Sequence, residues 1–526
     1  MTSLKSPHNI NLLLIYPPVS KPAEPPAGIA QLKRAVESYG HSCVTLDANV
    51  EGLHFLLEGD IPAPTPRLRS ALKNRQRNLD WIRDISIYAT FDRYKAAVLE
   101  LNRLLMAASE PLNASISFTD FQHKHLLPVR QEDLFQAAEQ PQQNPFFNYF
   151  ETALKWKIEQ AAPRFIGISL IYLSQALTAF ALIGWIRKNF PGVKLVLGGG
   201  LVTSWLRQPQ TNLFNGWVDH VIAGRGEQAL LELLGTHAPE RTFFAADYFD
   251  LKHSDYFSPI PVVSYTTSFG CYWRKCAFCP ECAEGNVYDP VPHDQVFEDL
   301  QSIAQKQPFL LHFLDNALSP ALLKKFAQRS LPPWYGYVRF TPELEDMDFC
   351  CALKQSGCVM LKLGLESGDQ QVLDHMQKGI ELHRASLILK NLRDAGIATY
   401  VYLLFGTPWE TETEARATMR FVLEHADCIN FINPAIFNLP LYSEEADNHL
   451  TRQFYAGDLS LYHDFEHPRG WNRSKVRQFL QKEFKTHAVI KKIIQANPPY
   501  FTSNHAPFFT PEFQNREKRY ERALAI

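Results

Sequence analysis

The chain has 526 residues, of which 46% are hydrophobic and 21% charged, and its formal net charge is −2. This length predicts about two to four domains with enough apolar residues for a sizeable core. The near-neutral charge argues against a nucleic-acid-binding surface as the main function.

The polar N-terminus, Met-Thr-Ser-Leu-Lys-Ser-Pro-His, runs directly into an apolar segment and resembles neither a signal peptide nor a transit peptide. No apolar run is long enough to span a bilayer. We therefore expect a cytoplasmic protein without membrane or nucleic-acid partners. A reducing compartment makes disulfides the least favoured use of its cysteines.

Strand and helix patterns alternate over the first 250 residues. The predicted helices span 28–39 and 176–189, and the predicted strands span 11–16, 43–47, 165–170, 193–197 and 220–223. Alternation at these lengths predicts an α/β domain with a doubly wound parallel sheet. Gly224 to Ala229 match G-x-G-x-x-A, but late in the sheet, so we interpret them as a connection with Glu227 in a first helical turn rather than an NAD site.

Residues 56 to about 160 form an insertion without strand patterns. Apolar side chains recur there at helical spacing, at Tyr94, Ala97, Val98, Leu101, Leu104 and Leu105. We expect a mainly helical cap on the first domain; a lid that closes over substrate is the alternative.

A second α/β series covers residues 258–446. Its six apolar strands are predicted at 262–267, 309–314, 335–339, 360–365, 399–405 and 428–437. Six such repeats predict a partial or complete parallel barrel of the TIM type, with chemistry at the carboxyl ends of the strands.

Residues 447–526 are predicted to form a helical and aromatic extension. An amphipathic helix follows Ser474, with apolar positions at Val476, Phe479, Leu480 and Phe484. We expect the aromatic tail to close the core rather than line the barrel mouth; its members are Tyr500, Phe501, His505, Phe508 and Phe509.

Four of the nine cysteines lie within twelve residues, at Cys271, Cys276, Cys279 and Cys282. Loop cysteines this close together cannot all be buried as small apolar side chains, so a metal or iron–sulfur site is predicted directly after the first strand of the second series. The other cysteines of this half are expected to be buried apolar residues, at Cys350, Cys351, Cys358 and Cys428.

The segment Gly270-Cys271-x4-Cys276-Ala277-Phe278-Cys279 resembles the cluster-binding loop of the radical S-adenosylmethionine (SAM) superfamily. The resemblance implies a [4Fe–4S] cluster on Cys271, Cys276 and Cys279, with the fourth iron open to SAM. The first interval is four residues here, against three in the family. Cys282 is interpreted as a bystander; if it binds, the site closes, and a four-cysteine zinc site is a further alternative.

The resemblance extends to strand ends over 258–446 and implies a partial (β/α)6 radical SAM barrel. It assigns SAM contacts to residues that follow the second to fifth strands: Asp315, Asn316, Arg339, Glu366, Ser367, Gly406 and Glu410. Glu410 is alternatively expected to cap the next helix. The segment 374–379 also matches the family, and its charges are expected to face solvent.

The N-terminal sheet resembles the cobalamin-binding domain of B12-dependent radical SAM proteins. The resemblance implies cobalamin contacts at Ser169, Gly198, Gly199 and Gly200, where a hydroxyl and small residues let the backbone approach a nucleotide tail. The cobalamin motif Asp-x-His-x-x-Gly is missing, and the similar segment Asp47 to Gly52 follows the wrong strand and lacks the histidine. A domain that has lost cobalamin is the alternative.

Together these resemblances imply an enzyme that cleaves SAM reductively and modifies an unactivated carbon, with methyl transfer from cobalamin as the natural continuation. They also imply a small-molecule or peptide substrate and an electron donor such as flavodoxin or ferredoxin. A non-catalytic iron–sulfur or zinc protein with a closed four-cysteine site is the alternative function.

Overall fold

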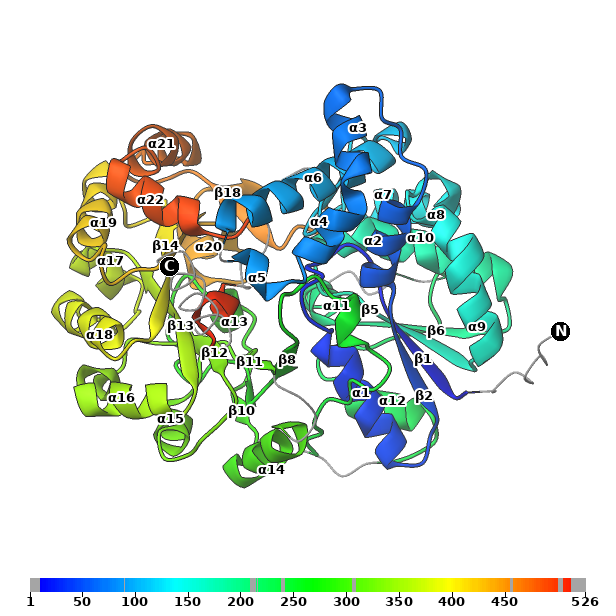
Figure 1. Cartoon of the computed structure of the whole chain (residues 1–526), viewed down its shortest axis with the longest axis horizontal. Helices are drawn as coiled ribbons and strands as arrows, with labels where there is room; N and C mark the ends of the chain where they lie inside the picture. The colour runs from blue at the N-terminus through cyan, green and yellow to red at the C-terminus, as the bar shows by residue number, and fades with distance from the viewer. Residues whose placement is uncertain are drawn as a thin grey trace, which may run out of the picture. The chain divides into compact units, whose positions relative to one another are not determined.

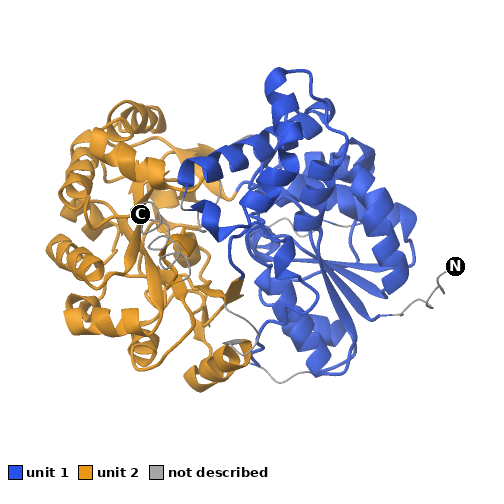
Figure 2. Cartoon of the chain, viewed as in Figure 1, with its two compact units in different colours: residues 1–261, 455–460 blue, residues 262–454, 461–526 orange. Residues whose placement is uncertain are grey.

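The computed structural model describes residues 10–88, 90–208, 214, 216–237, 242–304, 309–454, 457–499 and 505–511. The chain divides into two compact units (Figure 2). Unit 1 comprises residues 1–261 and 455–460, and unit 2 comprises residues 262–454 and 461–526. The α/β class predicted for both halves is confirmed.

Unit 1 contains a five-stranded sheet in the order β2-β1-β5-β6-β7, and every pair in it is parallel (Figure 1). Its strands are β1 (Leu12–Tyr16), β2 (Cys43–Asp47), β5 (Phe165–Ser169), β6 (Lys194–Gly198) and β7 (His220–Val221). All five lie where the apolar runs predict them. The chain passes from β1 to β2 on one side and later to β5 on the other, so the strand order reverses between β1 and β5. In open parallel sheets, ligands bind beyond the carboxyl ends of the strands near such a reversal.

One face of this sheet is covered by α1 (Ala27–Ser38) and α12 (Glu227–Leu233). Ile29 and Val36 of α1 and Leu230 of α12 belong to one buried apolar cluster with the strand residues Leu12 and Leu14. Helix α12 starts at Glu227, which confirms the glycine-containing connection predicted before it.

The insertion is mainly helical. Its helices are α3 (Pro66–Lys73), α4 (Arg75–Trp81), α5 (Ile85–Tyr88), α6 (Phe91–Ser109), α7 (Gln131–Glu139), α8 (Phe147–Tyr149) and α9 (Lys155–Ala161). All six apolar residues that predict α6 are buried. Helix α7 packs closely on α10 (Leu173–Asn189) at Gly184, where a Cβ atom would lie 1.8 Å from the Ala138 carbonyl oxygen.

The insertion also contains two strands that no sequence pattern indicates, β3 (Ala114–Ile116) and β4 (Phe121–His123), which form an antiparallel hairpin. Three-residue strands are too short to produce a recognisable alternating pattern. Their pairing is supported by the turn, where the Ser117 amide donates to the Asp120 carbonyl and the Asp120 amide donates to Ser117 Oγ.

Unit 2 contains a six-stranded parallel sheet in the order β15-β14-β13-β12-β11-β8. Its strands are β8 (Val262–Tyr265), β11 (Leu310–Phe313), β12 (Trp334–Val338), β13 (Cys358–Glu366), β14 (Ala398–Phe405) and β15 (Phe431–Ile436). The helices between them are α14 (His293–Ala304), α15 (Pro320–Phe326), α16 (Met347–Gln355), α17 (Gln370–His375), α18 (Leu382–Asp394) and α19 (Glu412–Glu424). Because every neighbouring pair in this sheet is parallel, all six carboxyl ends lie along one edge.

Three of the four cysteines predicted to be buried here are buried, namely Cys350, Cys358 and Cys428. The prediction is wrong for Cys351, which is partly exposed. Cys351 follows the fully buried Cys350 in α16, and successive helical residues point about 100° apart, so only one of the two faces the core.

The extension forms a three-stranded antiparallel sheet of β16 (Leu439–Pro440), β18 (Tyr462–Phe465) and β17 (Thr451–Gln453), which the sequence analysis missed. The predicted amphipathic helix is α21 (Arg473–Phe479), extended by a π-helical turn over 480–484 and followed by α22 (Ala488–Ala496).

The described part of the aromatic tail closes the core, as predicted. The ring of buried His505 lies 4.4 Å from the Tyr400 ring and 4.5 Å from the Phe431 ring, centroid to centroid. Phe509 also contacts Phe431, at 5.8 Å. Tyr500 and Phe501 lie outside the described residues.

Candidate active site

The cysteine loop begins where β8 ends and passes through the short strand β9 (Ser268–Phe269). Gly270 turns the chain with φ +69°, and a Cβ atom there would lie 2.4 Å from the Val287 carbonyl oxygen. The next backbone bonds link the cysteines themselves, because the Cys279 amide donates to the Cys276 carbonyl and the Cys282 amide to the Cys279 carbonyl. The loop is therefore built by backbone geometry at the carboxyl edge of the sheet.

All four cysteines are free thiols. Burial raises the pKa of Cys276 and Cys282, and it raises the pKa of Cys279 to about 12. The positive charges of Lys378 and Arg339 act in the opposite direction on the pKa of Cys276. The Cys282 side chain interacts with that of Cys279, so Cys282 lies within the same thiol cluster.

Arg339, predicted as a SAM contact, is buried beside the loop. Its Nη1 donates to Cys276 Sγ at 3.8 Å, its Nη2 donates to the Lys378 carbonyl, and its guanidinium lies 4.2 Å from the centre of the Trp273 ring. A thiolate here therefore meets a fixed positive charge, which favours the ionised, metal-binding form.

The four-residue interval between Cys271 and Cys276 is anchored by Trp273. Its Nε1 donates to the Gln377 carbonyl at 3.0 Å, and its ring lies against Gly379, where a Cβ atom would come within 2.3 Å of a ring carbon. The next residue, Arg274, has φ +49°, in the left-handed region that a non-glycine residue seldom adopts. The longer interval is thus folded outward onto residues 377–379. The sequence carries no pattern that pairs Trp273 with Gly379, so this contact was missed.

Glu366 and Lys378 form a partly buried ion pair next to the loop, with 2.8 Å between Oε1 and Nζ. Glu366 has φ +66° and follows an irregularity in the pairing of β13 with β14, which turns its carboxylate toward Lys378. Lys378 Nζ also lies 5.4 Å from the centre of the Phe278 ring. The expectation that the charges of segment 374–379 face solvent is therefore wrong for Lys378, because its ammonium has a carboxylate partner inside the fold.

Asp315 and Asn316 join the carboxyl ends of β11 and β8. The Asp315 carboxylate accepts from the Thr267 amide at 3.0 Å and from Thr267 Oγ1 and Ser268 Oγ at 2.6 Å each, and burial raises its pKa. Exposed Asn316 donates from Nδ2 to the Gly270 carbonyl at 3.2 Å. Asp315 holds the base of the cysteine loop, while Asn316 presents its amide at the surface of the site.

Ser367 is fully buried and lies close to Thr418 of α19, with 3.3 Å between their hydroxyl oxygens. Its Oγ also accepts from the Asp369 amide at 3.1 Å. Ser367 therefore links the turn after β13 to α19 and fixes the chain directly after Glu366.

Glu410 does not cap the next helix, so that expectation is wrong. Thr411 is the N-cap of α19 and forms a capping box with Glu414. The Glu410 side chain instead turns inward and is completely buried. Its Oε2 accepts from the Gly406 amide at 2.5 Å and from Trp471 Nε1 at 2.9 Å, whereas its Oε1 has no hydrogen-bond partner within the part of the chain that the structure describes. Burial raises the pKa of Glu410 to about 8.

In unit 1, the predicted cobalamin contacts meet at the carboxyl edge of the sheet. Ser169 ends β5 beside Gly198, which ends β6. Gly199 has φ +111° and precedes α11 (Gly200–Leu206), and a Cβ atom on Gly199 would lie 2.3 Å from the Leu170 carbonyl oxygen. Only glycine fits this close approach of two backbones.

Asp47 has a structural explanation that does not involve a ligand. Its Oδ1 accepts from the Asn49 and Val50 amides at the start of α2 (Ala48–Glu58), and its Oδ2 accepts from Tyr256 Oη at 2.9 Å. Burial raises its pKa to about 7. This role agrees with treating the segment from Asp47 to Gly52 as a chance match.

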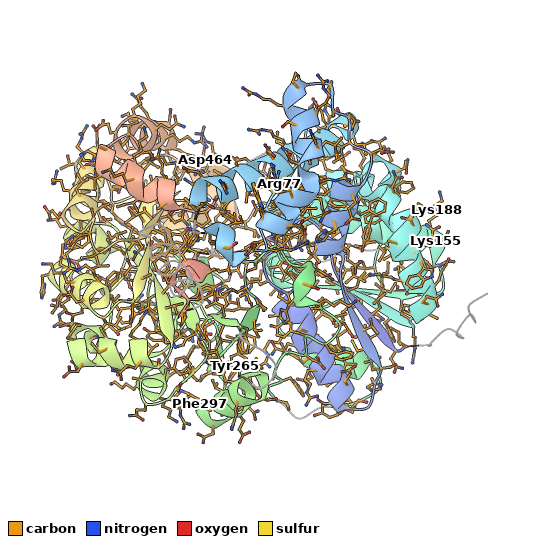
Figure 3. All side chains as sticks on the ribbon, in the orientation of Figure 1. Arg77, Lys155, Lys188, Tyr265, Phe297 and Asp464 are labelled. Carbon is orange, nitrogen blue, oxygen red and sulfur yellow. The ribbon has the colours of Figure 1, made fainter. Side chains whose placement is uncertain are left out.

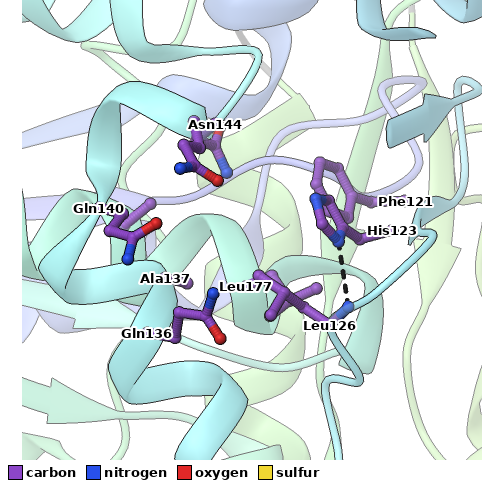
Figure 4. A pocket seen from close by; sticks show the side chains of 10 residues that line it. Phe121, His123, Leu126, Gln136, Ala137, Gln140, Asn144 and Leu177 are labelled. Carbon is purple, nitrogen blue, oxygen red and sulfur yellow. Dashed lines mark hydrogen bonds between the residues drawn. The ribbon is translucent and has the colours of Figure 1, made fainter. Parts of the chain in front are cut away.

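A cavity between the insertion and α10 is too small for a substrate. It lies between His123, Gln136, Asn144 and Leu177, and it has a volume of about 20 Å³ (Figure 4). This volume suits a single water molecule.

The thiol donors fit an iron–sulfur cluster by their chemistry. Among the described residues, no three or more Cys, His, Asp and Glu side chains converge closely enough to hold a single metal ion. A [4Fe–4S] cubane does not require such convergence, because each thiolate binds a different iron. Three cysteines on one loop beside a buried guanidinium match that requirement.

No protein-family model matches the chain. Three curated relatives match part of it: bacteriochlorophyllide d C-12(1)-methyltransferase of Chlorobaculum tepidum, hopanoid C-3 methylase of Methylococcus capsulatus, and anaerobic magnesium-protoporphyrin IX monomethyl ester cyclase of Rubrivivax gelatinosus. Their identities are 27%, 23% and 21%, over 27%, 44% and 60% of this chain. The matches span 32%, 45% and 62% of the relatives' own lengths.

Two solved structures match a larger part of the chain than these relatives do. The radical SAM methyltransferase TsrM from Kitasatospora setae, solved with tryptophan and the SAM analogue aza-SAM bound, matches with a TM-score of 0.53 at 15% identity, covering 98% of this chain and 100% of that one. The cobalamin-dependent radical SAM enzyme OxsB, solved with aqua-cobalamin bound, matches with a TM-score of 0.50 at 12% identity, over 84% of this chain and 55% of that one. These likenesses show a shared fold. Within the described residues, no helix has the length and apolarity needed to cross a membrane.

Proposed function

We propose that this chain, which has the fold of cobalamin-dependent radical SAM methyltransferases, is itself a radical SAM enzyme. The proposal is carried by one observation: three loop cysteines follow β8 at the carboxyl edge of a six-stranded parallel sheet, where Arg339 donates to Cys276 Sγ. In this assignment residues 258–446 form a partial (β/α)6 barrel, residues 1–250 a doubly wound cobalamin-binding-like domain, and residues 447–526 an extension.

Cys271, Cys276 and Cys279 would hold a [4Fe–4S] cluster. Such a cluster supplies the electron that cleaves the sulfonium carbon–sulfur bond of SAM into methionine and a 5′-deoxyadenosyl radical. Arg339 and Lys378 place positive charge beside Cys276 and thereby favour its thiolate.

The predicted SAM contacts divide into three groups by their position and present partners. Asn316, Glu366 and Arg339 carry polar atoms next to the loop, and we assign them direct contact with SAM. Asp315 and Ser367 are buried and engaged with neighbouring residues, so we assign them the positioning of the surrounding turns. Gly406 and Glu410 are hydrogen-bonded to each other, and we assign them the role of shaping the site at the end of β14.

Cobalamin would be held in unit 1 at the carboxyl edge between β5 and β6. Gly199 brings two backbone segments together there. Beside them, Ser169 carries a hydroxyl and its strand partner Gly198 has no side chain. The loop from Pro17 to Pro26 contains no histidine, so it would offer no imidazole to a bound cobalamin.

The reaction that these parts favour is methylation of an unactivated carbon, with cobalamin as the methyl source. Two of the curated relatives are methyltransferases and one is a cyclase, so another radical modification is the second outcome consistent with the same site. A small-molecule or peptide substrate and an electron donor such as flavodoxin or ferredoxin complete the proposal.

Anaerobic reconstitution with iron and sulfide, followed by dithionite and SAM, tests this function. We expect 5′-deoxyadenosine to form only with the reduced cluster. When cobalamin is also supplied as the methyl acceptor, we expect S-adenosylhomocysteine, the product of methyl transfer from SAM, in addition. A fully loaded cluster that yields neither product contradicts the proposal. The visible spectrum after addition of hydroxocobalamin tests unit 1 separately, because bound and free cobalamin separate on gel filtration.

The alternative is a non-catalytic protein with a closed four-cysteine site. Its support is the position of Cys282, which interacts with Cys279 within the same thiol cluster. A closed site would bind iron or zinc but give no spectral change on addition of SAM, because no iron would have an open coordination position.

A further inference from the structure

The carboxyl ends of β14 and β15 border a second pocket, of about 300 Å³, which lies wholly within unit 2. The extension closes its other sides with β18, residues 452–454 and the start of α21. This volume is at the lower end of the range for small-molecule sites and fits one aromatic ring system with a short substituent.

The pocket combines aromatic walls with an excess of positive charge. Its aromatic side chains include Phe437, Phe454, Phe465 and Trp471. Its charged side chains are two arginines and one aspartate, so with neutral histidines the lining carries one net positive charge.

The single carboxylate of the lining is already paired. Asp464 of β18, labelled in Figure 3, accepts from Arg452 Nε at 2.7 Å, as its partner across the β17–β18 pair. Arg473 Nη1 donates to two neutral oxygens, the Phe437 carbonyl at 3.1 Å and Asn438 Oδ1 at 2.7 Å. These bonds fix the Arg473 guanidinium, which also lies 5.1 Å from the centre of the Phe454 ring. A guanidinium held in one orientation keeps its positive charge at a fixed place in the pocket, where it attracts a carboxylate.

His467 does not add charge to the pocket. Its Nε2 donates to the Thr407 carbonyl at 2.8 Å, and its Nδ1 accepts from the Arg469 and Trp471 amides at 3.2 Å each. This arrangement needs the neutral ring, and burial lowers its pKa. Through His467 and Trp471 the floor of the pocket is joined to residues 407–410, at the same sheet edge as the cysteine loop.

We propose that this pocket binds the carboxylate-bearing aromatic part of the substrate, with Arg473 as the residue that recognises the acid. Describing the ligand as a substrate rests on the proposed radical SAM function; the selectivity for an aromatic carboxylate rests on the pocket alone.

Calorimetric titration of the full-length protein with indole-3-acetate and with uncharged indole-3-acetamide tests the proposal. The two probes have nearly the same shape, so their comparison in the wild-type protein needs no mutation. We expect the acid to bind at least tenfold more tightly. Equal affinity for the two probes, or no binding of either, overturns the proposal.

Arg473→Gln is expected to abolish the preference for the acid, and Arg473→Lys to restore part of it. Arg477→Gln is the matched control, because it removes an exposed positive charge from the same helix without touching the pocket. Loss of the preference in the Arg477 variant would mean that general electrostatics, not the pocket, selects the acid, and this result also overturns the proposal.

Failure of the pocket and failure of the radical SAM function are distinguishable. If the wild-type protein cleaves SAM but does not prefer the acid, the radical SAM proposal stands and the pocket proposal fails. If it prefers the acid but its loaded cluster does not react with SAM, the pocket proposal stands and the radical SAM proposal fails.

Discussion

At the scale of single residues, the cysteine loop depends on a contact outside the cysteines. Trp273 fixes the long interval by a hydrogen bond to Gln377, by packing on Gly379, and by a stacked Arg339. Because Arg339 also donates to Cys276, a displaced Trp273 ring would disturb the charge next to a cluster ligand.

Gly379→Ala is therefore expected to weaken cluster retention. A Cβ atom there would lie 2.3 Å from the Trp273 ring, and the residue has φ +64°. Gly396→Ala is the control, because it has φ +74° and meets only the end of a lysine side chain at 3.8 Å. Both variants bear the cost of a left-handed alanine, about 1–2 kcal/mol. We expect iron per chain after gel filtration to fall at least twofold in Gly379→Ala only; equal iron in both would refute the role of Trp273.

The buried Glu410 is expected to make the free energy of unfolding depend on pH. Burial raises its pKa to about 8 in the folded chain, against an ordinary value of 4.5, so folding favours the protonated acid. The contribution of Glu410 to the free energy of unfolding is therefore fully present below about pH 4.5. It is lost as the pH rises toward 8, by an amount on the order of 5 kcal/mol at most.

Glu410→Gln keeps an oxygen for the Gly406 amide and removes the titration. Urea unfolding between pH 5 and 8.5 is expected to show the variant gaining stability relative to wild type as the pH rises. Exposed Glu412→Gln is the control and is expected to leave the profile unchanged. Parallel profiles for Glu410→Gln and wild type would show that Glu410 is ionised in the folded chain.

At the scale of elements, strands are predictable from the sequence because buried parallel strands are continuous apolar runs. All eleven strands of the two parallel sheets lie within a few residues of their predicted positions. The hairpin of β3 and β4 and the small sheet of the extension were missed, because strands of two to four residues carry no period. Their pairing comes from turns and from packing that a local pattern does not contain.

The candidate site was predictable to the extent that its residues follow strands. The cysteines and the residues after β11 to β14 lie along one edge because parallel strands place their carboxyl ends together. The partners of those residues were not predictable: Lys378 reaches Glu366 through a left-handed turn, and Glu410 turns inward instead of capping α19. Both depend on side-chain direction after a turn, which spacing alone does not determine.

Gly199→Ala tests the element that we assign to cobalamin. The added Cβ would collide with the Leu170 carbonyl oxygen, so the ends of β5 and β6 would have to separate. Gly192→Ala is the control, since nothing lies within 4 Å of its Cβ position. Cobalamin retained after gel filtration, read from its visible spectrum, is expected to fall at least fivefold in the Gly199 variant only. Retention equal to wild type would remove Gly199 from the proposed site.

At the scale of the whole molecule, each unit contains one parallel sheet whose carboxyl edge collects the candidate site residues. The fold shared with radical SAM enzymes leaves the number of cysteine ligands as the central question. Three thiolate ligands leave one iron open to SAM, whereas four would close the cluster and leave an electron carrier.

The most direct test measures SAM-cleavage products, 5′-deoxyadenosine and S-adenosylhomocysteine together, per chain in alanine variants of the four cysteines, each reconstituted anaerobically and assayed for iron. We predict that Cys271→Ala, Cys276→Ala and Cys279→Ala lose the cluster and at least 100-fold of product formation, while Cys282→Ala keeps iron and product within about twofold of wild type. Loss of iron in Cys282→Ala, or a wild-type cluster that never yields product, would contradict a three-cysteine radical SAM site.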